Sequence, residues 1–460
     1  MENFLQEAED LYNRLEGVLH AGEEKFSLQD GQTLSDWLEK LEEAIVRCQR
    51  MKFRLGRLLD YDGLKGDGFS LDEIVGFEQE DRAYLEQVDG YYKNNLVKRE
   101  YMFGYPANLE EYSYATQYLR WVESKMYLMN NCGDPYQNGN YGMDSKDIEQ
   151  KIVSAFAKNY ALEEGKYWGY ITSGGTESNF WGVREGFQRF PKGKLYFSSD
   201  AHYSVEKFVS AGENAPMYPY EIIPCNARGE MDPDALKAAI LRDAEQGVVG
   251  TVLVLTWGTT VRGAIDDVKG LTGWLKEQGL PYYCHLDAAH YGGIAANQQD
   301  SPALRDVVGL GIDSLSVSLH KFLGTARVNG VLLAIERTNR RVVEYIGQED
   351  STLLGSRDYL PFSTYQRVRE MLWRKETNHY AENVRFFEDL LLRKGVSYQK
   401  HGQGNTFVVD KPREEVCKKY QLATFTDGDG KEYAHVIIFP FHQKGVMTGL
   451  VEELKGERHD

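Results

Sequence analysis

Two residues in this sequence have the types and the surroundings that Schiff-base chemistry requires. Lys321 follows a small, hydroxyl-rich stretch, Ser316-Val317-Ser318-Leu319-His320. Asp287 ends a mostly apolar and aromatic run and lies 321 − 287 = 34 residues earlier. An amine that forms a Schiff base and a carboxylate that holds a pyridine nitrogen protonated are the two protein groups that pyridoxal phosphate (PLP) chemistry needs most. The pair therefore predicts a PLP site, in which burial lowers the pKa of the Lys321 amine and makes it nucleophilic.

Two features upstream fit the same cofactor. The segment Thr172-Ser173-Gly174-Gly175-Thr176-Glu177-Ser178-Asn179 is expected between a strand and a helix, where backbone N–H groups bind phosphate. His202 follows another predicted strand, and its imidazole is expected to stack on the cofactor ring. Each residue alone has a plain structural alternative: a turn and helix cap for the loop, a strand-end cap for Asp287 and a buried structural role for His202. Their order along the chain favours the cofactor site.

Two more loops carry candidate residues. Thr256 to Asp267, which includes Thr259, is rich in small and hydroxyl residues that let a cofactor approach the backbone, although an ordinary glycine-rich loop is the alternative. Tyr345 lies in a polar stretch, Arg340 to Asp350, that is predicted to be a mobile loop over the cleft with the phenol as proton donor.

The elements that position these residues alternate between strands and helices from about residue 145. Near-continuous apolar strands separated by helical patterns, as at 234–244 and 268–278, predict a mostly parallel sheet covered on both faces. Ligands gather at the carboxyl ends of such strands, where the candidate residues fall. The predicted strands are 167–171, 194–198, 251–255, 282–286, 314–318 and 328–334.

The remaining segments predict an α/β protein of three parts. Apolar residues recur at helical spacing in two runs, 4–19 and 34–58, so residues 1–95 are expected to be a helical extension that wraps the main body or a dimer mate, with a separate binding module as the alternative. Residues 96–345 are expected to form a large PLP-binding domain. Residues 346–460, with a helical stretch at 364–394 and a final α+β segment, are expected to form a small domain.

Composition excludes several classes of function. The net charge of 53 − 70 = −17 argues against a nucleic-acid-binding or anionic-membrane surface. No stretch approaches the roughly 18 apolar residues of a spanning helix, and the first residues carry no export signal. The five cysteines are scattered without metal-ligand spacing, so we expect reduced thiols, no metal site and a cytoplasmic protein.

Taken together, these motifs resemble the group II PLP-dependent amino-acid decarboxylases of the aspartate-aminotransferase fold (PLP fold type I). The likeness is greatest to bacterial PLP-type histidine decarboxylases and plant serine decarboxylases, and it runs from about Phe103 to the C-terminus. The matching segments are Gly104 to Asn108, Asn130 to Asp134, Gly174 to Glu177, Ser198 to Val205, Gly258 to Asp267, His320-Lys321 and Gly355-Ser356-Arg357.

The resemblance implies a role for each matching position. It implies a homodimer that decarboxylates an L-amino acid, with Lys321 as the Schiff-base lysine, Asp287 as the partner of the pyridine nitrogen and Tyr345 as the loop proton donor. Tyr105 and Asn108 would line the substrate side, which His202 also borders. Ser356 belongs to a segment expected to approach the neighbouring subunit's cofactor. The full set expected around the cofactor is Ser173, Gly174, Gly175, His202, Thr259, Asp287, Ala289, Ser318, His320, Lys321 and Ser356.

Three departures from the family pattern lie close to the expected site. Leu319 replaces a common glycine, Thr325 to Asn329 replaces a proline-containing stretch, and His290-Tyr291 replaces smaller or apolar residues. The sequence therefore predicts decarboxylation of histidine or a similar polar amino acid. It leaves open another PLP-dependent reaction at Cα, such as carbon–carbon lysis or oxidative decarboxylation, and a non-catalytic scaffold.

Overall fold

The computed structural model describes residues 71–110, 113–126, 129–210, 217–297, 304, 306–338, 340–354, 360–374, 377–402 and 404–456. Contacts divide the chain into two units, Met1–Asn95 and Leu96–Asp460. Helix α3 (Leu71–Glu100) begins in the first unit, and the helical runs predicted before it lie outside the described residues. In the part of the chain that is described, no helix is both long enough and apolar enough to cross a membrane.

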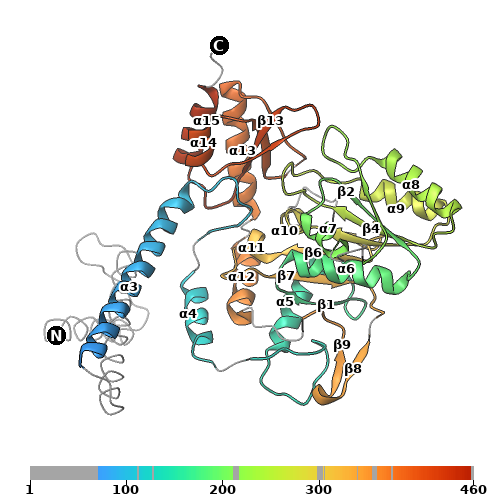
Figure 1. The fold of residues 1–460 in the computed structure, drawn as a ribbon, viewed down its shortest axis with the longest axis horizontal. Helices are drawn as coiled ribbons and strands as arrows, with labels where there is room; N and C mark the ends of the chain where they lie inside the picture. The colour runs from blue at the N-terminus through green and yellow to red at the C-terminus, as the bar shows by residue number, and fades with distance from the viewer. Residues whose placement is uncertain are drawn as a thin grey trace, which may run out of the picture. The chain divides into compact units, whose positions relative to one another are not determined.

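A seven-stranded sheet forms the centre of the second unit, in the order β1-β7-β6-β5-β4-β2-β3 (Figure 1). Every neighbouring pair is parallel except the two pairs that include β7, which runs antiparallel to β1 and β6. The mostly parallel sheet predicted from the sequence is confirmed. Its strands are β1 (Trp168–Thr172), β2 (Lys194–Ser198), β3 (Tyr220–Ile223), β4 (Thr251–Thr256), β5 (Tyr282–Asp287), β6 (Ser314–Ser318) and β7 (Gly330–Ala334).

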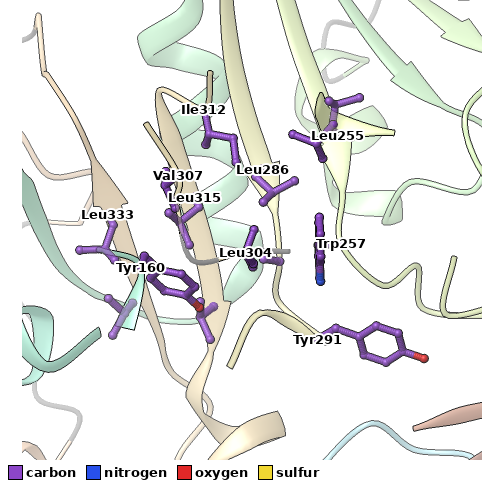
Figure 2. Close-up of a cluster of buried hydrophobic side chains, with 14 of the residues drawn as sticks. Tyr160, Leu255, Trp257, Leu286, Tyr291, Leu304, Val307, Ile312, Leu315 and Leu333 are labelled. Atoms are coloured by element: carbon purple, nitrogen blue, oxygen red, sulfur yellow. The ribbon is translucent and has the colours of Figure 1, made fainter. Parts of the chain in front are cut away.

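Helices cover both faces of this sheet because alternate strand residues point to opposite sides. Val252 and Val254 of β4 pack with α6 and α7, whereas Leu253 and Leu255 belong to a larger cluster with α5, α8, α9 and α12. Figure 2 shows part of the larger cluster, with side chains from neighbouring strands packed side by side. The helices of this region are α4 (Tyr114–Glu123), α5 (Lys146–Asn159), α6 (Gly175–Arg189), α7 (Tyr203–Val209), α8 (Pro233–Glu245), α9 (Val268–Glu277), α10 (Gly292–Asn297), α11 (Leu319–Phe322) and α12 (Pro361–Arg374).

A smaller antiparallel sheet, in the order β10-β11-β13-β12, has its own hydrophobic cluster with α13 and α15. The predicted C-terminal α+β domain is therefore confirmed. The single helical stretch expected at 364–394 is instead assigned to two helices, α12 and α13. The elements here are α13 (Thr377–Lys394), β10 (Tyr398–Gln399), β11 (Thr406–Asp410), α14 (Glu414–Lys419), β12 (Ala423–Thr426), β13 (Glu432–Ile437) and α15 (Lys444–Lys455).

Two features of the fold were not predicted. The edge strand β3 is only four residues long, so its sequence carries too short an alternation to be recognised. The polar stretch around Tyr345 is a small hairpin rather than an unstructured loop. It consists of β8 (Arg341–Val343), the 3-10 turn η3 (Glu344–Ile346) and β9 (Gln348–Asp350).

Candidate active site

Lys321 lies in the short helix α11, at the turn between β6 and its antiparallel neighbour β7. Leu319, two residues before Lys321, is fully buried in the core. After the helix, the carbonyl of Leu323 accepts two hydrogen bonds, of 3.1 and 2.9 Å, from the Arg367 guanidinium. Lys321 itself is half-buried. Burial lowers the pKa of its amine, and the negative charge of Asp287 partly opposes that shift. The amine is therefore held near the carboxylate and is easier to deprotonate than a surface lysine.

Asp287 is the last residue of β5, and only 4% of it is exposed. Its Oδ2 accepts a hydrogen bond of 2.8 Å from Asn179 Nδ2, and its Oδ1 accepts one of 3.1 Å from the backbone N–H of Ala289. Both partners are donors, and together they fix the orientation of the carboxylate. Each oxygen keeps acceptor capacity for one more donor, such as a protonated pyridine nitrogen.

The glycine loop and the Lys321 segment meet at β7. Gly330 of β7 pairs with Thr172 on one side and with Ser318 on the other. A Cβ atom placed on Gly175 would lie 3.2 Å from Ala289 Cβ and 3.3 Å from Ser318 Oγ, so these residues are close neighbours.

The glycine loop also leads directly into the N-terminus of α6. Gly174 has a φ of +126°, a conformation that side-chain-bearing residues rarely adopt. Ser173 donates its backbone N–H to Glu177 Oε2 at 2.7 Å, which holds the loop against the first turn of the helix. The unpaired backbone N–H groups of that turn suit a phosphate.

His202 and Thr259 lie on the loops after β2 and β4. His202 Nδ1 lies 2.7 Å from Ser204 Oγ. Burial lowers the pKa of His202, the negative charge of Asp287 raises it, and the positive charge of Lys321 lowers it. The imidazole therefore lies within electrostatic range of both groups. Thr259 is buried and its hydroxyl oxygen accepts a hydrogen bond of 3.0 Å from the Ala264 N–H, so it shapes its own loop.

Asn108 contacts α11, and His320 lies within it. Asn108 Nδ2 donates to the carbonyl of Phe322 at 3.0 Å, so this amide braces the lysine-bearing helix. His320 Nδ1 lies 3.1 Å from the carbonyl of Asn329, and burial lowers the pKa of its imidazole to about 4. Tyr105 is 56% exposed.

The structure places Tyr345 away from this site, and it does not describe Ser356. Tyr345 is 74% exposed in the β8–β9 hairpin, which packs on residues 134–140 through hydrogen bonds such as Asp134 N to Glu349 O, 2.9 Å. The hairpin follows the carboxyl end of β7, and because β7 runs antiparallel, this is the sheet edge opposite the ends of β5 and β6. Ser356 lies outside the described residues. Both roles stay predictions.

Sequence reasoning missed Asn179, the direct partner of Asp287. Asn179 lies one helical turn after Gly175, and residues at that spacing share one helix face, which is the signal that could have found it. His290 was noted only as a departure from the family pattern. It is 4% exposed, and neither ring nitrogen has a hydrogen-bond partner among the described residues.

The residues present fit PLP. The structure supplies an amine with a lowered pKa and a buried carboxylate that can accept from a further donor. The glycine-containing N-terminus of α6 lies next to Ala289 and Ser318. Over the described ranges, no group of three or more His, Cys, Asp or Glu side chains is arranged to hold a metal ion.

Comparison with known proteins gives the family. The pyridoxal-dependent decarboxylase conserved domain matches residues 189–363. Histidine decarboxylase of Pseudomonas entomophila (strain L48) is 33% identical over 394 residues, which are 82% of this chain and 91% of that protein. The chain belongs to the pyridoxal-dependent decarboxylase family.

This decarboxylase is also similar to serine decarboxylase 1 of Oryza sativa subsp. japonica, at 32% identity over 84% of this chain and 78% of the plant protein. The crystal structure of L-methionine decarboxylase from Streptomyces sp. 590, in its internal aldimine form, superposes with a TM-score of 0.66 at 21% identity, covering 82% of this chain and 96% of that one. The decarboxylase therefore has PLP fold type I. It is a PLP-dependent amino-acid decarboxylase.

Proposed function

We propose that the enzyme decarboxylates a small polar L-amino acid, histidine or a similar one, to the amine and CO2. The polarity of the proposed substrate side chain is argued from His290. Its ring is buried beside the site, and its pKa is lowered well below the usual value, first by burial and then by the positive charges of Lys321 and His435. The relatives' names, histidine and serine decarboxylases, support the same substrate class.

His290 is part of a group of buried polar atoms without hydrogen-bond partners. The Asn405 side chain interacts with His290 and favours its protonated form. Neither Asn405 Oδ1 nor Thr406 Oγ1 makes a hydrogen bond of normal geometry to a described residue. An unsatisfied buried polar group costs about 1–3 kcal/mol. A neutral imidazole, an amide oxygen and a hydroxyl offer both donors and acceptors, so a bound polar side chain would recover that cost and an aliphatic one would not.

We propose that the predicted residues act as follows. PLP, when bound, would supply an electron sink for the bonds at the substrate Cα. Lys321 would hold the cofactor between turnovers, and Asp287 would keep the ring nitrogen protonated. The glycine loop, with Ser318 and His320, would bind the phosphate. Side chains that turn the Cα–carboxylate bond perpendicular to the ring select loss of CO2 over other reactions.

A proton must return to Cα, and we propose His202 or Tyr345 as its source. Because the Tyr345 hairpin leaves the opposite edge of its own sheet, the phenol would serve the site of a partner subunit in a cytoplasmic homodimer. Exposed aromatic residues support such an association: Tyr118 and Trp121 of α4 stack at 6.2 Å and are 62% and 50% exposed.

A panel of all common amino acids, with products identified by mass, tests the reaction and the substrate. We expect an amine from a polar amino acid, and a product other than the amine and CO2 would contradict the proposal. His290→Leu should lower kcat/KM for the polar substrate about 10-fold or more while aliphatic amino acids gain relatively.

The matched control for that variant is His401→Leu. His401 is also buried, with Nε2 2.7 Å from the carbonyl of Arg228, but it lies in the small-domain region away from Lys321. This control should leave the substrate preference unchanged. An equal change of preference in both variants would argue against a specific role for His290.

Mixing two inactive variants tests the homodimer and Tyr345 together. Homodimers of Lys321→Ala and of Tyr345→Phe should each lose activity, whereas refolded or co-expressed mixtures should regain part of it, because one site of each heterodimer is then intact. No recovery in a mixture shown to contain heterodimers would refute the shared site.

A further inference from the structure

A chain of buried hydrogen bonds lies behind Asp287, and its direction is fixed by chemistry. An ionised carboxylate only accepts, so Asn179 must turn its Nδ2 to Asp287 Oδ2, at 2.8 Å, and its Oδ1 away. That oxygen lies 3.1 Å from His285 Nε2, which must therefore carry the proton. Ser316 Oγ donates to the same oxygen at 3.3 Å.

The chain continues through His285 along the same face of the sheet, under α6. His285 is fully buried, and burial lowers the pKa of its imidazole to about 4, so it carries one proton at neutral pH. With Nε2 protonated, Nδ1 accepts from Ser314 Oγ at 2.8 Å, and Ser314 in turn accepts from the Tyr283 hydroxyl at 2.7 Å. Every proton in this row points toward Asp287, so the bonds polarise one another.

The second N–H of Asn179 starts a branch to His202. Asn179 Nδ2 lies 3.3 Å from Ser204 Oγ, which accepts it. The Ser204 hydroxyl proton then points to His202 Nδ1 at 2.7 Å, and the Ser204 backbone N–H reaches the same nitrogen at 3.3 Å. Since Nδ1 accepts, a neutral His202 carries its proton on Nε2.

We propose that Asn179 is a positioning residue that couples the two groups around the cofactor. One amide orients Asp287, and through Ser204 it fixes His202 as the Nε2–H tautomer, which presents a proton donor to the amino-acid substrate. This inference rests on the proposed roles of Asp287 and His202. It assigns a role to Asn179, a residue for which no individual role was predicted.

The test of the Asp287 branch is the pH titration of the visible absorbance of the PLP-loaded enzyme, with Asn179→Leu. Without the Asn179 N–H, the carboxylate of Asp287 attracts the proton on the ring nitrogen more strongly, so the ring carries less positive charge. The midpoint of the absorbance titration should then move up by about one pH unit or more. Where Asn179→Leu does not fold, Asn179→Ser, whose side chain is too short to reach Asp287, should give the same shift.

The matched control is Asn383→Leu. Asn383 is also buried and its Nδ2 donates to the carbonyls of Phe439, Pro440 and His442, within the small-domain region. It should lower stability without moving the titration. A folded, PLP-loaded Asn179 variant that titrates as wild type, or an equal shift in the control, would overturn the inference.

Ser204→Ala tests the branch to His202. The variant removes the hydroxyl donor to His202 Nδ1 but keeps the backbone N–H donor. It should leave the absorbance titration in place, shift the 15N resonances of His202 part of the way toward the Nδ1–H tautomer, and change the pH profile of kcat/KM. Unchanged His202 resonances would overturn this branch. Failure of the wild-type enzyme to bind PLP would instead overturn the proposed function, so the two failures are distinguishable.

Discussion

Gly182, in the middle of α6, leaves space for the His285 ring, and a Gly182→Ala substitution should displace that ring. A Cβ atom at Gly182 would lie 2.3 Å from His285 Nδ1 and 2.4 Å from Cγ, distances that packed atoms do not tolerate. Both residues are buried, and His285 is hydrogen-bonded to Ser314 on one side and to Asn179 on the other. The ring cannot retreat without losing one of these bonds.

The size of the effect follows from three contributions. Overpacking costs about 1–3 kcal/mol, and leaving a buried imidazole nitrogen unsatisfied costs about 1–3 kcal/mol more. Alanine in place of glycine within a helix returns about 1 kcal/mol. We therefore expect Gly182→Ala to lower the free energy of unfolding by about 1–5 kcal/mol, measured by urea unfolding of the apoenzyme, and to weaken PLP binding because Asn179 and Asp287 lose their support.

Gly273→Ala is the matched control. Gly273 also lies inside a helix, α9, but no atom lies within 4 Å of the Cβ that the substitution adds. It should raise the free energy of unfolding by up to about 1 kcal/mol. A Gly182→Ala enzyme as stable as the wild type, with unchanged affinity for PLP, would refute the reasoning about His285.

Three further predictions concern charged groups. Lys194→Met removes one partner of the buried Asp243 carboxylate, 2.7 Å away, and should cost about 1–3 kcal/mol in urea unfolding, since Tyr196 and Arg242 remain. Burial alone would raise the pKa of Asp243, but hydrogen bonds from Lys194, Tyr196 and Arg242 lower it. The stability that the ionised Asp243 contributes is present above its unfolded-state pKa and is lost as the pH falls through its folded-state pKa. The Lys194→Met variant should therefore lose less stability in acid than the wild type. Arg367→Lys keeps a charge but not the paired donors to Leu323 O and should weaken PLP binding in a fluorescence titration about 10-fold; unchanged affinity would contradict the anchoring of α11. The rate of PLP capture by the apoenzyme should rise with pH through an amine pKa below the lysine value of 10.5, and Asp287→Asn should lower that pKa further; a wild-type midpoint at or above 10.5 would exclude a desolvated Lys321.

Much of the large domain was predictable because its strands are short apolar runs bounded by turn residues. The predicted strand at 194–198 matches β2, and the one at 314–318 matches β6. The direction of β7 was not predictable, since an apolar run reads the same whether its neighbour is parallel or antiparallel. That direction decides which sheet edge the Tyr345 hairpin leaves.

Within the site, the chemistry of Lys321 and Asp287 was visible because their residue types are unusual after apolar strands. Asn179 was not, because a polar residue in a helix is ordinary until the sheet beneath it is known. Its partners, His285 and Ser316, come from strands more than a hundred residues later in the chain. Their contact is a property of the fold, and no local pattern carries it.

The antiparallel pairing of β6 with β7 has a consequence for engineering the enzyme. Because Ser318 and Gly330 are paired across the ladder, the lysine-bearing segment is a loop fastened at both ends. Inserted residues at its exposed crest, Ala326 to Val328, would bulge outward without moving α11. A single residue inserted before Leu319 would instead turn Lys321 away from the site. A linker or reporter should therefore be inserted at Ala326 to Val328 and not before α11.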